Sequence, residues 1–121
     1  MLKKHRFSCE IISNKSKITK NIQSQARDVR YGILKNFCKK KKVKILLTAH
    51  NLEDQVETFF IRLSRGSGIT GLSGMKTISK LDKDISLFRP LLDVKKNTLI
   101  KISKKIFGKY FKDPSNKNMK Y

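Results

Sequence analysis

The sequence predicts an α/β fold in which a mainly parallel sheet is flanked by helices. Helical and extended apolar segments alternate along the chain, which is typical of domains built on a parallel sheet. The extended segment at residues 43–48 (VKILLT) lacks clean polar alternation, which indicates a strand buried on both faces. A chain of 121 residues with 38% hydrophobic residues is long enough for one such domain.

Periodicity assigns the remaining elements. Strands are predicted at residues 7–12 and 85–91, and Pro90 ends the second. Helices are predicted from Ile18 into the lysine run at 39–42, from Glu53 to Ser64, and over residues 93–108. Gly66 stands where a helix favours a left-handed residue after its end. The run DPSN at 113–116 is expected to form a turn.

The chain is strongly basic, with a formal charge of +20 from 29 lysines and arginines. Such a field attracts phosphates and permits a nucleic-acid partner. A lysine-rich composition produced by an AT-rich genome would give the same charge, so the charge alone does not name RNA. No apolar run reaches the ~18 residues of a membrane helix and no signal peptide is evident, so we expect a cytoplasmic protein without a membrane partner. Cys9 and Cys38 do not form a metal-binding pair.

The chemistry-bearing residues concentrate in residues 46–75. His50 follows the predicted strand at 43–48, and ligands of open parallel sheets bind at this carboxyl end of the strands. Asp54 falls in the first turn of the next helix and Glu57 one turn later. These carboxylates could hold Mg²⁺ or an amine, and the imidazole could contact a phosphate or a sugar. We take His50, Asp54 and Glu57 as candidate catalytic residues and assign no metal ligands.

A glycine-rich loop follows the same helix. Arg65, Gly66, Ser67 and Gly68 offer a guanidinium and free backbone N–H groups, which together could cradle a phosphate. A purely structural interpretation remains open for the whole stretch. Acidic residues at a helix start complement the helix dipole, and a glycine at its end terminates it, without any ligand.

The run TAHNLEDQVETFFIRLSRGSGITGLSGM at 48–75 resembles the signature of the tRNA(Ile)-lysidine synthetase family, whose catalytic domain has the PP-loop (adenine nucleotide hydrolase-like) ATPase fold. QARDVRY at 25–31, FRPLL at 88–92 and DPSN at 113–116 agree with further family motifs, in the same order. Asn51 and Glu53 stand where the family commonly has histidine and aspartate, and both replacements remain polar.

The resemblance implies an ATP-dependent C–N ligase acting on isoleucine tRNA with a CAU anticodon. ATP, with Mg²⁺, adenylates the wobble cytidine, and the ε-amine of free lysine then displaces AMP from C2, which changes decoding from AUG to AUA. By this resemblance Asp54 holds the lysine ammonium and Glu57 supports the site or the metal. The residues expected to contact ATP, the activated base or tRNA are His50, Arg27, Arg30, Arg65, Gly66, Ser67 and Gly68.

The family's early ATP loop, S-G-G-x-D-S, has no counterpart in this sequence. Residues 1–121 are therefore expected to be the C-terminal portion of the catalytic domain, without the N-terminal PP-loop segment or C-terminal tRNA-binding domains. We expect this chain alone not to form lysidine, and its exposed strand edges to require a homodimer or the missing N-terminal half. One alternative is an inactive or split-gene remnant that at most binds RNA non-specifically. Another is a tRNA-thiolating PP-loop enzyme, which typically uses a cysteine pair that this chain lacks.

Overall fold

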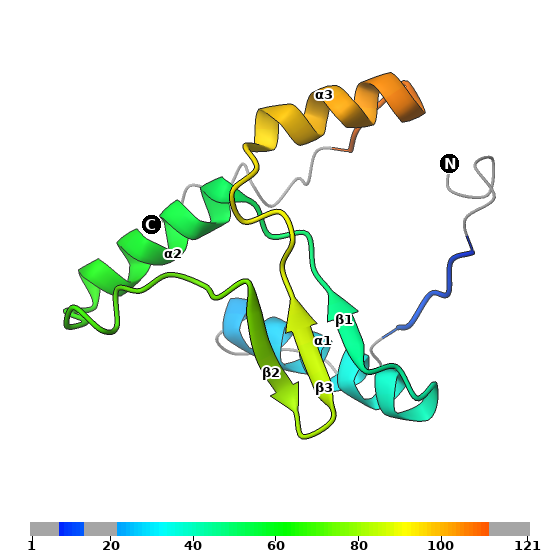
Figure 1. Cartoon of the computed structure of the whole chain (residues 1–121), viewed down its shortest axis with the longest axis horizontal. Helices are drawn as coiled ribbons and strands as arrows, with labels where there is room; N and C mark the ends of the chain where they lie inside the picture. Colours follow the sequence, from blue (N-terminus) through cyan, green and yellow to red (C-terminus); the bar gives the residue numbers. More distant parts are fainter. Residues whose placement is uncertain (1–7, 14–21, 112–121) are drawn as a thin grey trace.

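The computed structural model of the protein describes residues 8–13 and 22–111. They form three helices and one three-stranded sheet (Figure 1). In chain order the elements are α1 (Ile22–Lys40), β1 (Ile45–Leu47), α2 (Leu52–Ser64), β2 (Ile78–Asp82), β3 (Ile85–Phe88) and α3 (Lys96–Phe107). The predicted α/β class is confirmed, and so are the three helices and the strands at 43–48 and 85–91, within a few residues at their ends.

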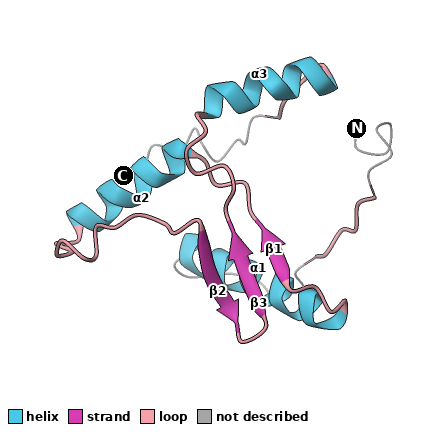
Figure 2. Ribbon diagram, in the orientation of Figure 1, coloured by secondary structure: helices cyan, strands magenta, loops and turns pink. Residues whose placement is uncertain are grey.

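The sheet has the order β1-β3-β2 (Figure 2). β1 runs parallel to β3, with Leu46 opposite Leu87, and β2 pairs with β3 as an antiparallel hairpin. We did not predict β2. Its sequence, ISKLD, alternates outward and inward residues, but lysine and aspartate interrupt the apolar pattern that identifies a strand. The described sheet therefore contains one parallel and one antiparallel pairing.

One face of this sheet is buried and the other is not. Ile85 and Leu87 of β3 are only 2% and 4% exposed, whereas Ile45 and Leu47 of β1 are 56% and 60% exposed. Successive side chains of a strand point to opposite faces, so the exposed pair lies on the face opposite Ile85 and Leu87. The prediction that residues 43–48 are buried on both faces is wrong, because no helix in the described part of the chain covers this second face.

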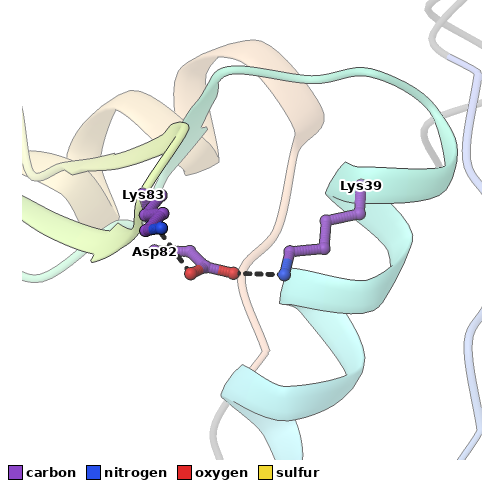
Figure 3. Close-up of polar contacts among 3 residues, drawn as sticks. All are labelled: Lys39, Asp82 and Lys83. Atoms are coloured by element: carbon purple, nitrogen blue, oxygen red, sulfur yellow. Dashed lines mark hydrogen bonds and ion pairs between the residues drawn. The ribbon is translucent and has the colours of Figure 1, made fainter.

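The end of α1 is tied to the β2–β3 hairpin by an ion pair (Figure 3). Lys39 Nζ lies 2.6 Å from Asp82 Oδ2, and Asp82 Oδ1 accepts a hydrogen bond from Lys83 N at 2.9 Å. The hydrogen bond from Lys39, followed by the one from Lys83, lowers the pKa of Asp82 below its ordinary value. The pair joins the last turn of α1 to the end of β2, at the turn between β2 and β3.

The predicted left-handed glycine is confirmed: Gly66 has φ 68° directly after the C-cap of α2. The predicted strand at 7–12 is wrong over the part that the structure describes, since residues 8–13 are irregular. Within the described ranges no strand lies alongside to pair with this segment, and a strand without a partner leaves its backbone groups unpaired. Phe7, the expected helix start at 18–21 and the turn at 113–116 lie outside the described residues. No helix in 22–111 is both long enough and apolar enough to cross a bilayer.

Candidate functional site

A cavity of about 410 Å³ opens where α1, the end of β1 and the start of α2 meet. Three of the predicted site residues, Arg30, His50 and Asp54, lie in its wall. The described residues that line it are Arg30, Tyr31, Leu34, Thr48, Ala49, His50 and Asp54. The expectation of a polar cluster at the carboxyl end of the strand at 43–48 agrees with this arrangement, because Thr48, Ala49 and His50 directly follow β1.

His50 is oriented by its neighbour two residues earlier. Thr48 Oγ1 lies 2.9 Å from His50 Nδ1, which fixes the ring and leaves Nε2 for another partner. Burial lowers the pKa of His50 below 6.5, and the charge of Arg89 lowers it further. Asp54 raises this pKa but does not outweigh the other two effects. The imidazole is therefore neutral at pH 7 and can accept a proton or a hydrogen bond.

Asp54 serves the helix start as well as the cavity. Asn51 Oδ1 accepts a hydrogen bond from Asp54 N at 3.2 Å, and Asp54 Oδ2 accepts one from Asn51 N at 2.8 Å. This reciprocal pair is a capping box, which satisfies two backbone donors that the helix itself cannot pair. Asp54 thus has a structural role at the helix start, and this role is compatible with a ligand because only one carboxylate oxygen takes part in the box.

Two arginines of α1 lie against the ring of Tyr31. The guanidinium carbons of Arg27 and Arg30 are 5.7 and 5.4 Å from the ring centroid, within the range of a cation–π contact. Arg30 lines the cavity and Arg27 does not. The Tyr31 hydroxyl is buried without a hydrogen-bond partner in the part of the chain that the structure describes. Tyr31 is not among the predicted site residues, since the burial of a phenol cannot be read from a helical motif.

The other predicted residues do not join this cavity. Glu57 is exposed on α2, and Arg65, Gly66, Ser67 and Gly68 follow the opposite end of that helix. Eleven residues separate Asp54 from Arg65, which corresponds to about 16 Å along a helix at 1.5 Å per residue. The sequence therefore predicted one site where the described residues form two separate regions.

The expected cradle of free N–H groups is wrong for two of its members. Gly66 N donates to Leu63 O at 3.0 Å and Ser67 N donates to Arg62 O at 3.1 Å. These bonds satisfy carbonyls at the end of α2 that have no partner further along the helix. The positive φ of Gly66 ends the helix as predicted. It also turns these two N–H groups toward the helix instead of toward a ligand.

The described residues do not offer a metal centre of their own. No group of three histidine, cysteine or acidic side chains comes together within residues 8–13 and 22–111. Cys38 is buried in α1 and Cys9 is exposed, and both are free thiols. Of the residues that the structure describes, Asp54 is the single carboxylate in the lining of the cavity.

Comparisons with known proteins identify the family of this chain. A relative described as tRNA(Ile)-lysidine synthase from Wolbachia pipientis wMel is 47% identical over 107 residues, covering 88% of this chain and 25% of the relative. Proteins of the same description from Anaplasma marginale and Zymomonas mobilis are 41% and 38% identical, covering 95% and 83% of this chain. The chain thus spans about a quarter of the length of the first two, and 31% of the third. The profile of the PP-loop domain family, ATP_bind_3, matches residues 1–121, and the chain therefore belongs to the PP-loop family.

Proposed function

We propose that this chain is the part of a tRNA(Ile)-lysidine-forming ligase that positions lysine and the activated cytidine. The observation that supports it best is the cavity that unites His50, Asp54 and Arg30 at the end of β1. The relatives that match most of this chain carry the name of that activity. In this proposal the chain forms the later portion of a PP-loop catalytic domain and works in the cytoplasm on isoleucine tRNA.

The reaction joins lysine to an adenylated base. The ε-nitrogen of lysine forms a bond to C2 of the cytidine, the bond from C2 to the AMP oxygen breaks, and the amine loses a proton. ATP is the substrate that supplies the AMP group. An enzyme for this step must hold a cation, accept a proton and stabilise phosphate charge.

Asp54 suits the first task. Its Oδ2 is held by Asn51 N, which fixes the carboxylate in one orientation, and its other oxygen can accept from an ammonium group. A charged hydrogen bond of this kind contributes about 1.5–3 kcal/mol, enough to select lysine over an uncharged side chain.

His50 suits the second task. The imidazole is neutral at pH 7 because burial and Arg89 lower its pKa, and Thr48 fixes its ring. A neutral imidazole in the same cavity as Asp54 can take the proton that the ε-amine of lysine must lose before it attacks.

The arginines suit the third. Arg30 lines the cavity, and Arg27 flanks the same tyrosine one helical turn earlier. Guanidinium groups bind phosphate oxygens in a bidentate manner, so these residues would contact ATP or the tRNA backbone. Arg65, Ser67 and Gly68 would extend the contact at the far end of α2, and Glu57 would support the site from its exposed position.

Among the described residues, Asp54 is the one carboxylate that lines the cavity, and its Oδ2 accepts a hydrogen bond from Asn51 N. Mg²⁺ is commonly held by one or two carboxylates together with substrate phosphates, so the described residues would supply a single carboxylate ligand there. We therefore assign no step of the reaction to residues of this chain acting through the metal.

The test measures lysidine in the complete protein that carries this chain, given isoleucine tRNA, lysine and ATP. Lysine-dependent release of AMP and incorporation of labelled lysine at the wobble cytidine are the expected results. His50→Gln should reduce the rate of lysine transfer more than it reduces tRNA binding, while Lys101→Ala, exposed on α3, serves as the matched control. RNA binding that ignores sequence, falls steeply with salt and is accompanied by no lysine incorporation would instead identify a non-catalytic RNA-binding protein.

A further inference from the structure

The glycine-rich loop does not project freely from the end of α2. It runs back along the helix, from Gly66 to Met75, and continues into β2 (Figure 1). We propose that Arg62, Gln55 and Arg89 are positioning residues that anchor this return path and so fix the loop relative to the cavity. The catalytic purpose of the anchors rests on the proposed function, whereas their effect on the loop does not.

Arg62 makes the first anchor, near the end of α2. Its Nη1 donates hydrogen bonds to Gly71 O and to Gly74 O, each at 3.1 Å. One side chain thus joins two carbonyls of the loop, on the chain segment just past Ser67 and Gly68. Charge-assisted hydrogen bonds are about twice as strong as neutral ones, so this contact is a strong restraint on the loop.

Gln55 makes the second anchor, next in sequence to Asp54. Its Nε2 donates to Met75 O at 2.9 Å, and its Oε1 accepts from Met75 N at 2.6 Å. The side-chain amide pairs with both backbone groups of one residue, as a neighbouring strand would. A Cβ at Gly74 would lie 3.0 Å from Gln55 Oε1, and Gly74 has φ 35°, so glycine is required for this approach.

Arg89 makes the third anchor, at the end of β3. It is only 7% exposed, and its Nη1 donates to Lys76 O at 2.8 Å and to Ser79 Oγ at 2.9 Å. No carboxylate forms an ion pair with it among the described residues. Burying a guanidinium without an acidic partner costs desolvation free energy. The hydrogen bonds to Lys76 O and Ser79 Oγ are what Arg89 gains in return, so we infer that its role is to hold this segment.

The three anchors act in the order of the chain. Arg62 holds residues 71 and 74, Gln55 holds residue 75, and Arg89 holds residues 76 and 79. Arg89 directly follows Phe88, whose carbonyl accepts a hydrogen bond from the cavity-lining Thr48 N at 2.9 Å, so the third anchor lies next to the cavity wall. The loop at 65–68 is therefore fixed relative to the cavity through α2 and the end of β3, although none of its residues lines the cavity.

The first experiment is residue-resolved hydrogen exchange on the complete protein carrying Gln55→Ala or Arg62→Ala. We expect the amides of Leu72, Gly74 and Met75 to exchange at least about fivefold faster, since a hydrogen bond contributes on the order of 1 kcal/mol, which is a factor of about five in the opening equilibrium. Arg62→Lys, which keeps a cationic donor, should restore much of the protection, and Lys101→Ala should change nothing. Unchanged exchange rates in both alanine variants would contradict the proposal that these side chains anchor the loop. Equal acceleration in α1 and β3 would show general unfolding and would also contradict it.

The second experiment separates positioning from folding in the same variants. The KM for tRNA or ATP should rise about tenfold while the KM for lysine stays within about twofold, because the loop moves and the Asp54 end of the helix does not. An equal rise in all KM values, or none, contradicts the positioning role. If the parent protein makes no lysidine, the proposed function fails, and the exchange rates alone then decide whether the anchors exist.

Discussion

The two ends of α2 use opposite means to present functional groups. At the start, Asn51 and Asp54 bind each other through side chains, and His50 is held by Thr48, so the groups that could react are fixed locally. At the end, the segment from Arg65 onward is rich in glycine and is held by hydrogen bonds from the side chains of Arg62 and Gln55. The difference shows that local capping is enough to order a reactive side chain, whereas a loop rich in glycine needs external anchors.

The largest expected effect comes from removing charge at the start of α2 without removing the cap. In Asp54→Asn an amide oxygen can still accept from Asn51 N, so the melting temperature should change little. The lost ammonium partner should lower kcat/KM for lysine about 10- to 100-fold, since a charged hydrogen bond contributes about 1.5–3 kcal/mol. Steady-state kinetics with lysine as the varied substrate measures it. Equal loss for tRNA would place Asp54 outside lysine binding.

A smaller effect is expected from adding a side chain at the other end. Gly74→Ala must adopt a positive φ and displace Gln55, so it should lower the free energy of unfolding by about 1–2 kcal/mol or more. Gly32→Ala is the matched control, because Gly32 lies inside α1 with open space around it. Alanine there should stabilise the helix by up to about 1 kcal/mol. Denaturant unfolding of both variants gives the comparison, and equal results would show that the loop is not packed against Gln55.

Removing the cap alone should cost about 1 kcal/mol. Asn51→Ala deletes the acceptor for Asp54 N but leaves the carboxylate, so stability falls by the usual value of an N-cap. The KM for lysine should rise only slightly, because Asp54 loses one restraint and keeps its charge. Thermal unfolding together with the lysine titration measures both. A loss of lysine binding as large as in Asp54→Asn would show that the cap, not the charge, is what matters.

The smallest effect concerns the ionisation of His50. Its pKa lies below the ordinary value because of burial first and Arg89 second, with Asp54 opposing them. Asp54→Asn should therefore lower the pKa further, as followed by NMR titration of the ring. The unfolded chain binds this proton at higher pH than the folded one, so His50 contributes a loss of stability as pH falls below about 6.5. A pKa that rises in the variant would contradict the assigned charges.

More of the fold than of the candidate site could be predicted from the sequence. α1, α2 and α3 have clear apolar periodicity and end signals, and each was predicted to within a few residues. β2 was missed because charged residues interrupt its pattern. His50, Asp54 and Arg30 were predicted as site residues, and the cavity at the end of β1 brings these three together. Gln55, Arg62 and Arg89 were not singled out, because a long-range contact with a backbone carbonyl leaves no periodicity or spacing in the sequence.

The mixed sheet also has a consequence for the order of folding. The β2–β3 hairpin joins neighbouring segments, so its pairing closes only a short turn, whereas β1 pairs with β3 across the whole of α2 and the glycine-rich loop. Closing a longer loop loses more chain entropy, and such pairings form late. We therefore expect the hairpin and α2 to form early and the β1–β3 pairing to limit the folding rate. Arg62 and Gln55 would then speed folding, because they shorten the flexible path between the paired strands.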